Sequence, residues 1–308
     1  MRILNYFLIN TSVHEPVNFL PKTNSMLFKR HYYYEVAGLP DLFLDENRAK
    51  VSVKTFKEEF RKTLHRKDYA LMEVLFLKYD NQNLLNLLLK KDKPWQELGN
   101  YSSELLEEEI RKTDDRIPEY MRSFIDKFKS GERDNDEMPW ETVLDTYFYE
   151  YLLSLNNDFL RTYYSFLLDF TNVTTALALR EHKMPPANQL IGDNVVTRSI
   201  PRSNARDFGL TQDFAEIDKI LTAWQSDTIT TREKNLDVIK WQWIDEHTFF
   251  EYFTIERLLA FMLQLEIAER WMRLDPETGR SMFDKLLDRL TRDYKLPEEF
   301  NLRQIKRS

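Results

Sequence analysis

Apolar residues recur along most of the chain at intervals of three and four, the spacing that places them on one face of a helix. A clear run follows Asp68, where Leu71, Leu75 and Phe76 share such a face, and we expect Asp68 to cap this helix. The stretches for which we predict helices are residues 55–64, 68–89, 102–129, 142–156, 158–183, 213–224, 236–274 and 281–294. Most of the chain is therefore predicted to be helical.

Prolines and polar clusters mark the breaks between these helices. Pro118 divides one predicted helix, and the pair Pro185 and Pro186 ends another. Residues 130–139 are polar and form the best candidate for a linker, whereas residues 189–209 have the least regular pattern.

The glycine content supports the same fold class. Only 6 of the 308 residues are glycine, whereas sheets joined by tight turns need many residues with positive φ. We therefore predict an all-α fold, an elongated or funnel-shaped assembly of two to three related helical modules. The expected parts are an N-terminal extension with little order (1–30), module 1 (31–130), module 2 (140–235) and module 3 (236–308).

A short polar pattern recurs inside the long helices, at an offset of 89 residues between its first two copies. Each copy has two polar residues three apart, so both project from the same helix face. The copies are Asp80 with Asn83, Asp169 with Asn172 and, as a more distant match, Glu266 with Glu269. Two interpretations are open: these side chains cap or bridge neighbouring helices, or they line a shared central surface where modules meet.

Charge and cysteine content limit the partners and the compartment. The net charge is −7 with both signs interspersed, which gives no basic surface for a nucleic acid. The chain has no cysteine, as expected in a reducing compartment. Its apolar runs are shorter than a membrane span, and residues 1–20 lack the features of a signal peptide. We expect a cytoplasmic protein.

Catalytic motifs are absent from the sequence. It has no glycine-rich phosphate loop and no G-x-S-x-G elbow, and its five histidines are scattered without the spacing of a metal site. We therefore expect no enzymatic activity and no metal or cofactor. One enzyme class stays open, a helical enzyme that uses carboxylates, which a buried pocket with raised carboxylate pKa values would favour.

Three arginines form a possible contact site. Arg198, Arg202 and Arg206 follow each other at helical intervals of four residues. Pro201 can sit only at the start of a helix, so the three need not share a face. They fit either a solvated loop or an anchor for an acidic partner.

The repeated segments resemble the helical modules of the C-subunit family of V-type/A-type ATPases, whose members are also called d subunits. The matching segments are Tyr79-Asp80-x-x-Asn83-Leu84-x-x-Leu87-Leu88, Asp169-x-x-Asn172 and the late helix around Glu266 and Glu269. The opening Tyr32-Tyr33-Tyr34-x-x-Ala37-Gly38-Leu39-Pro40-Asp41 is similar to an uncharacterised bacterial family whose members accompany V-type ATPase subunits.

This resemblance implies a non-catalytic subunit of the central stalk. Such subunits are helical funnels of three related subdomains that cap the membrane rotor ring and seat the shaft, so they couple ATP hydrolysis to ion or proton transport. The implied partners are the shaft and ring subunits, and the implied place is the inner face of the membrane, reached through them. By the same resemblance, the repeated polar residues are expected near the centre.

The alternative is a helical scaffold or adaptor that binds a protein in a concave groove. Architecture distinguishes the two hypotheses: a closed assembly of related modules favours the stalk subunit, and an open superhelix favours the adaptor.

Overall fold

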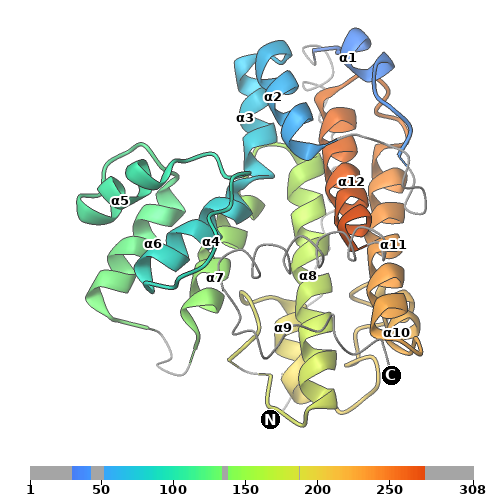
Figure 1. The fold of residues 1–308 in the computed structure, drawn as a ribbon. Helices are drawn as coiled ribbons and strands as arrows, with labels where there is room; N and C mark the ends of the chain where they lie inside the picture. Colours follow the sequence, from blue (N-terminus) through green and yellow to red (C-terminus); the bar gives the residue numbers. More distant parts are fainter. Residues whose placement is uncertain (1–29, 43–51, 134–137, 187, 275–308) are drawn as a thin grey trace, which may run out of the picture.

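The computed structural model describes residues 30–42, 52–133, 138–186 and 188–274. These residues form twelve α-helices and one 3-10 turn, and they contain no strand (Figure 1). The predicted all-α fold is therefore confirmed. The N-terminal extension apart from Arg30, and the helix predicted over residues 281–294, lie outside the described residues.

The helices follow the expected stretches with shifted ends. In chain order they are α1 (Tyr33–Ala37), α2 (Val53–Thr63), α3 (Arg66–Val74), α4 (Leu77–Leu88), α5 (Ser103–Arg111), α6 (Glu119–Ser130), α7 (Trp140–Leu153), α8 (Asp158–Glu181), α9 (Val195–Ser199), the 3-10 turn η2 (Ile200–Arg202), α10 (Ile217–Trp224), α11 (Ile229–Thr248) and α12 (Ile255–Leu274).

The start of α3 corrects one prediction. Asp68 does not cap this helix; His65 does, because its Nδ1 accepts a hydrogen bond from the Lys67 backbone N–H at 3.2 Å. Asp68 lies in the first turn instead, where its carboxylate accepts a hydrogen bond of 2.5 Å from the Tyr32 hydroxyl. A carboxylate in a first turn is still favoured by the helix dipole, so the residue suits the helix start without being its cap.

Two predicted helices are each divided in the structure. The helix expected over residues 68–89 breaks between α3 and α4, and that over residues 236–274 breaks between α11 and α12. The second break, residues 249–254, is rich in aromatic residues, so the apolar pattern continued through it and gave no sign of a turn. Pro118 precedes α6 and separates it from α5, as predicted.

The long helix α8 runs through the middle of the molecule, with α5, α6 and α7 on one side and α11 and α12 on the other (Figure 1). Aromatic side chains fill both interfaces. The rings of Phe166 and Trp243 stack with centroids 4.9 Å apart between α8 and α11, and Phe148 of α7 meets Tyr164 of α8 at 6.4 Å. These rings are buried, so the aromatic clusters of α7 and α8 form core.

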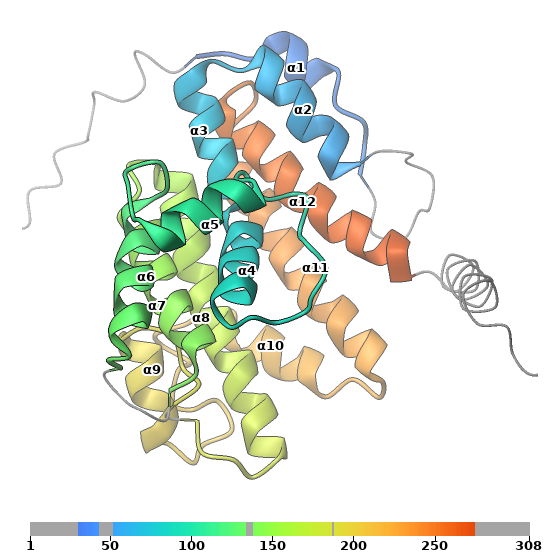
Figure 2. The same cartoon turned by 60° about the vertical axis from the view of Figure 1, so that its left-hand side comes forward.

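The last described helix, α12, packs against helices near the start of the described chain. Phe56 of α2 packs edge-on against Phe261 of α12, with ring centroids 4.9 Å apart. Before α1, the Tyr32 backbone N–H donates to the Phe253 carbonyl oxygen at 2.7 Å. Both views show α12 beside α2 (Figures 1 and 2). The described helices therefore close on themselves and do not form an open superhelix, whereas the proposed module boundaries stay a prediction.

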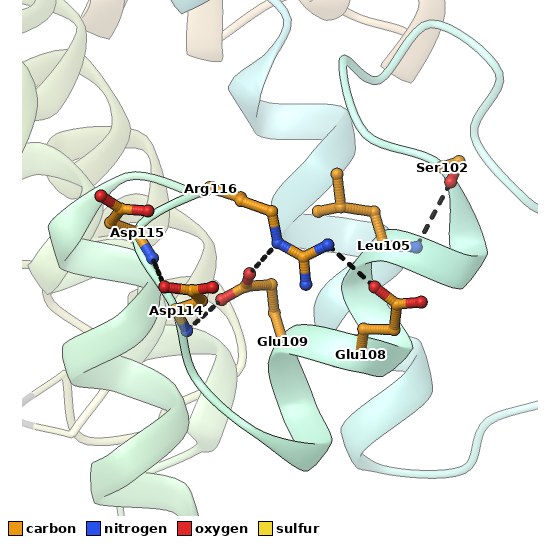
Figure 3. A network of polar contacts seen from close by, with 7 residues as sticks. All are labelled: Ser102, Leu105, Glu108, Glu109, Asp114, Asp115 and Arg116. Atoms are coloured by element: carbon orange, nitrogen blue, oxygen red, sulfur yellow. Dashed lines mark hydrogen bonds and ion pairs between the residues drawn. The ribbon is translucent and has the colours of Figure 1, made fainter.

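A polar network fixes the connection from α5 to α6 (Figure 3). The fully buried Glu109 accepts hydrogen bonds from Arg116 Nε at 2.8 Å and from the Asp114 backbone N–H at 2.7 Å. Arg116 also pairs with Glu108 at 2.8 Å. A buried carboxylate is tolerated when it is paired and hydrogen-bonded in this way, so the network serves the local fold.

A second acidic residue, Asp145 of α7, makes stability depend on pH. Burial, together with the charge of Glu141, raises the pKa of Asp145 from 3.8 to about 6. The folded state thus favours the protonated carboxyl, and the stability that this group contributes is complete below about pH 4 and lost as the pH rises through 6. Asp145→Asn should therefore stabilise the protein at pH 7, by about 2 kcal/mol, and change little near pH 4.

Urea unfolding of the wild type and of Asp145→Asn at the two pH values measures this effect. A difference of equal size at both would contradict the pKa assigned to Asp145, because a mere packing change does not vary with pH.

Candidate functional site

The first copy of the repeated pattern holds the connection between α4 and α5, which runs back beside α4 (Figure 2). The Asn83 side chain pairs with both backbone groups of Gln96: Oδ1 accepts from the N–H at 2.8 Å and Nδ2 donates to the carbonyl oxygen at 3.0 Å. The Asp80 carboxylate accepts from the backbone N–H groups of Asn100 and Tyr101 at 2.7 and 3.0 Å, and from Asn100 Nδ2 at 2.9 Å.

The second copy does the same for the connection between α8 and α9. Asn172 Oδ1 accepts from the Ile191 backbone N–H at 2.8 Å, and its Nδ2 donates to the Ile191 carbonyl oxygen at 3.0 Å. Asp169 Oδ1 accepts from the side chain of Asn194 at 2.7 Å. Asn194 in turn caps α9, so this contact also sets where that helix begins.

The two copies share one bonding pattern, to which Asp80 adds two bonds from backbone N–H groups. In each, the asparagine binds one loop residue through its N–H and its C=O, and the aspartate binds an asparagine a few residues later, ahead of the next helix. We call each unit a loop latch. Asp80, Asn83 and Asn172 are fully buried, and Asp169 is half-buried. Their role in holding the two loops is therefore clear from these bonds, whereas a role as partner contacts stays a prediction.

In the first latch, the carboxylate of Asp80 and the ammonium group of Lys57 both bind the loop that contains Gly99. Burial raises the pKa of Asp80 to about 6, against the opposing effect of the N–H groups that bind it. Lys57 Nζ donates to the carbonyl oxygens of Leu98 and Gly99 at 2.6 and 3.1 Å, and burial lowers its pKa to about 8. The loop thus accepts hydrogen bonds from Lys57 on one side and donates them to Asp80 on the other.

Gly99 leaves no room for a side chain in this latch. A Cβ atom there would lie 2.5 Å from Asp80 Oδ1 and 3.3 Å from Asn83 Nδ2. We expect Gly99→Ala to lower the free energy of unfolding by about 2 kcal/mol, since the carboxylate must move from its backbone donors. Chemical denaturation measures the loss. Gly131→Ala is the comparison, because a Cβ there meets no atom within 4 Å while φ is +72°, so its cost comes from backbone strain and not from a steric clash.

The third copy makes different contacts. Glu266 accepts from Lys78 Nζ at 2.7 Å and from the Tyr79 hydroxyl at 3.1 Å, so it joins α12 to α4. Glu269 accepts from the Val53 backbone N–H at 3.2 Å and so joins α12 to the start of α2. The two glutamates therefore connect separate parts of the chain and do not form a loop latch.

Glu266 and Glu269 also line a cavity of about 570 Å³. Its wall comes from the start of α2, from α4 and the loop after it, from α8, and from α11 and α12, so all three proposed modules contribute. The lining residues are Val53, Lys78, Tyr79, Leu98, Tyr163, Leu167, Asp237, Lys240, Leu263, Glu266, Ile267, Glu269, Arg270 and Arg273. We call it the central cavity.

The charges around the central cavity are arranged in pairs. Four cations and three carboxylates line it, and each cation has a carboxylate partner: Lys78 with Glu266, Arg273 with Glu269, and Lys240 and Arg270 with Asp237. Burial raises the pKa values of three other carboxyl groups: Asp80 and Asp169 in the latches, and Asp145 in α7. None of the three lines this cavity.

Asp237 is the residue of this site that sequence reasoning missed. It is 2% exposed and accepts hydrogen bonds from Lys240 Nζ at 3.2 Å, from Arg270, and from Trp271 Nε1 at 2.8 Å. Only the three-residue spacing from Lys240 is visible in the sequence, because the other two donors lie on α12. It connects α11 and α12 beside the central cavity.

The three predicted arginines do not share a helix. Arg198 lies in α9 and pairs with Asp193 at 2.6 Å, Arg202 ends the 3-10 turn, and Arg206 lies in the loop beyond. All three are exposed. Arg206 lines a smaller cavity of about 300 Å³ with Arg180 and Trp224. Whether these arginines anchor a partner stays a prediction.

The described residues show neither a cluster of metal ligands nor a membrane-spanning helix. They contain no group of three or more His, Asp or Glu side chains placed to hold a metal ion. No helix among them is long and apolar enough to cross a membrane.

Comparison with known proteins gives one match. A family model described as "Protein of unknown function (DUF2764)" matches residues 29–294. No curated protein and no solved structure matches the chain. The matched region includes every described helix, both loop latches and the central cavity, so the chain belongs to the DUF2764 family.

Proposed function

We propose that this chain is a non-catalytic subunit of a V-type or A-type rotary ATPase, which couples the central shaft to the membrane ring. The observation that carries the proposal is the pair of similar loop latches, 89 residues apart, in a set of helices that together line the central cavity. Related modules around a common centre are what the resemblance to the C-subunit family implies.

The packing of the last described helix against the first ones favours the stalk subunit over the adaptor hypothesis. An open superhelix offers a long concave groove, with each repeat touching only its neighbours. In this chain α12 packs against α2, and Glu266 pairs with Lys78, 188 residues away along the chain. Such long-range bonds stiffen the body, as a subunit that transmits torque requires.

The central cavity is the part of the surface that we assign to the shaft. Its volume of about 570 Å³ is that of a small-ligand site, so it would receive a few side chains from the shaft tip and not a whole helix. Arg273 and Lys78 keep 61% and 45% of their side chains exposed beside it and can re-pair with acidic groups of a partner.

In this assembly the protein lies in the cytoplasm and reaches the inner face of the membrane through its partner subunits. Other subunits hydrolyse ATP, so this chain needs no active site for its role. Its contribution to ion or proton transport is mechanical.

The test measures whether ATP-driven ion transport depends on this chain. In inverted membrane vesicles from cells that lack this chain, we expect ATP-driven ion uptake to be lost, and added wild-type protein to restore it. Arg273→Glu should restore uptake poorly, and Lys219→Glu, an exposed residue on α10, should restore it fully. Uptake that is unchanged without the chain would refute the proposal and leave the adaptor as the better account.

A further inference from the structure

Six aromatic side chains are exposed at one end of the molecule. Tyr34 is 89% exposed and Phe250 80%, and the others are Tyr33, Phe249, Tyr252 and Phe253. They come from α1 and from the turn between α11 and α12, which lie together at the top of Figure 1. We call them the aromatic tip. Large apolar side chains grouped in the open mark a contact surface rather than a core.

Local bonds hold the two parts of the aromatic tip together. The Tyr32 backbone N–H donates to the Phe253 carbonyl oxygen at 2.7 Å, and the rings of Tyr33 and Phe253 lie 4.6 Å apart. Phe249 and Phe250 meet edge to face, with 88° between their ring planes. Their rings therefore stand at different angles and do not present one flat face.

A basic corner adjoins the aromatic tip. Residues 61–67, from the end of α2 to the start of α3, contain Arg61, Lys62, Arg66 and Lys67, all exposed, and no acidic residue. The Tyr32 hydroxyl links this corner to the tip, because it donates to Asp68 at 2.5 Å and accepts from the His65 backbone N–H at 3.4 Å.

We propose that this end of the molecule binds directly to the surface of an anionic lipid bilayer, with the aromatic tip in the head-group region and the basic corner over the lipid phosphates. The inference does not depend on the proposed function, and it adds a direct contact with the bilayer to the contact made through partner subunits. Aromatic rings beside lysine and arginine are the composition of membrane-interface segments. A bilayer also accepts rings at unrelated angles, whereas a protein partner would need a matching surface that is both apolar and acidic.

Vesicle flotation with the full chain tests this proposal. We expect binding to phosphatidylcholine vesicles that contain about a quarter phosphatidylglycerol and much weaker binding to phosphatidylcholine alone. Phe249→Ser with Phe250→Ser should reduce the bound fraction about tenfold. Arg66→Glu with Lys67→Glu should remove the preference for the anionic vesicles, and added salt should do so in the wild type.

Two control variants change exposed residues outside the aromatic tip and the basic corner. Ile229→Ser alters a residue that is 77% exposed at the far end of α11, and Lys219→Glu reverses a charge on α10; both should bind as the wild type does. Circular dichroism checks that each variant is folded. Absence of wild-type binding to anionic vesicles, or loss of binding equal in the tip variants and in Ile229→Ser, would overturn the proposal.

Discussion

Replacing Asn172 by alanine is expected to lower the free energy of unfolding by about 3 kcal/mol. The Asn172 side chain is fully buried and satisfies both the N–H and the C=O of Ile191, which is itself buried. Alanine would leave these two backbone groups without partners inside the protein, and each such group costs about 1–3 kcal/mol. Urea denaturation monitored by circular dichroism measures the change.

The loop-latch model predicts that Asn83→Ala has a loss of similar size, because Asn83 makes the same two bonds to Gln96. Thr174→Ala serves as the control, since this half-buried hydroxyl bonds only to carbonyl oxygens of its own helix. If Asn172→Ala costs no more than Thr174→Ala, the latch does not hold the loop in the way described.

Asp237→Ala is expected to be at least as damaging, at about 4 kcal/mol. The buried carboxylate balances Lys240 and Arg270 and accepts the Trp271 N–H. Its removal leaves Lys240 and the indole donor without this partner, and leaves Arg270 with the more distant and exposed Glu233. The packing of α11 on α12 should loosen, which thermal unfolding detects as a lower midpoint.

Glu233→Ala is the matched variant for this prediction. Glu233 also pairs with Arg270, at 3.7 Å, but its side chain is 47% exposed, so the loss should stay below about 1 kcal/mol. Equal effects of Asp237→Ala and Glu233→Ala would mean that burial does not determine the value of the Asp237 contacts.

The sequence was sufficient to predict the helical fold and to single out the latch residues. Asp80 and Asn83, and Asp169 and Asn172, share a helix face because of their spacing alone. Their partners could not be predicted, because the two loops differ in length: Gln96 lies 13 residues after Asn83, and Ile191 lies 19 residues after Asn172. A contact that depends on how an irregular loop returns leaves no periodic signal.

The central cavity and the aromatic tip show a second limit of prediction from the sequence. Asp237 meets Arg270 33 residues later, across a turn that the apolar pattern did not reveal. The residues of that turn, including Phe249 and Phe250, continued the spacing of a buried helix face, although the structure exposes them. Apolar spacing predicts which residues can share a face, and only tertiary packing decides whether that face is covered.

The central claim, that this chain is a subunit of a rotary ATPase, is tested most directly by purifying the tagged full-length protein from detergent-solubilised membranes of its own cells. Mass spectrometry should find the catalytic, shaft and ring subunits of a V-type or A-type ATPase in fixed ratio to it. Recovery of the chain without any of these subunits, from membranes in which the ATPase is present and intact, would contradict the claim.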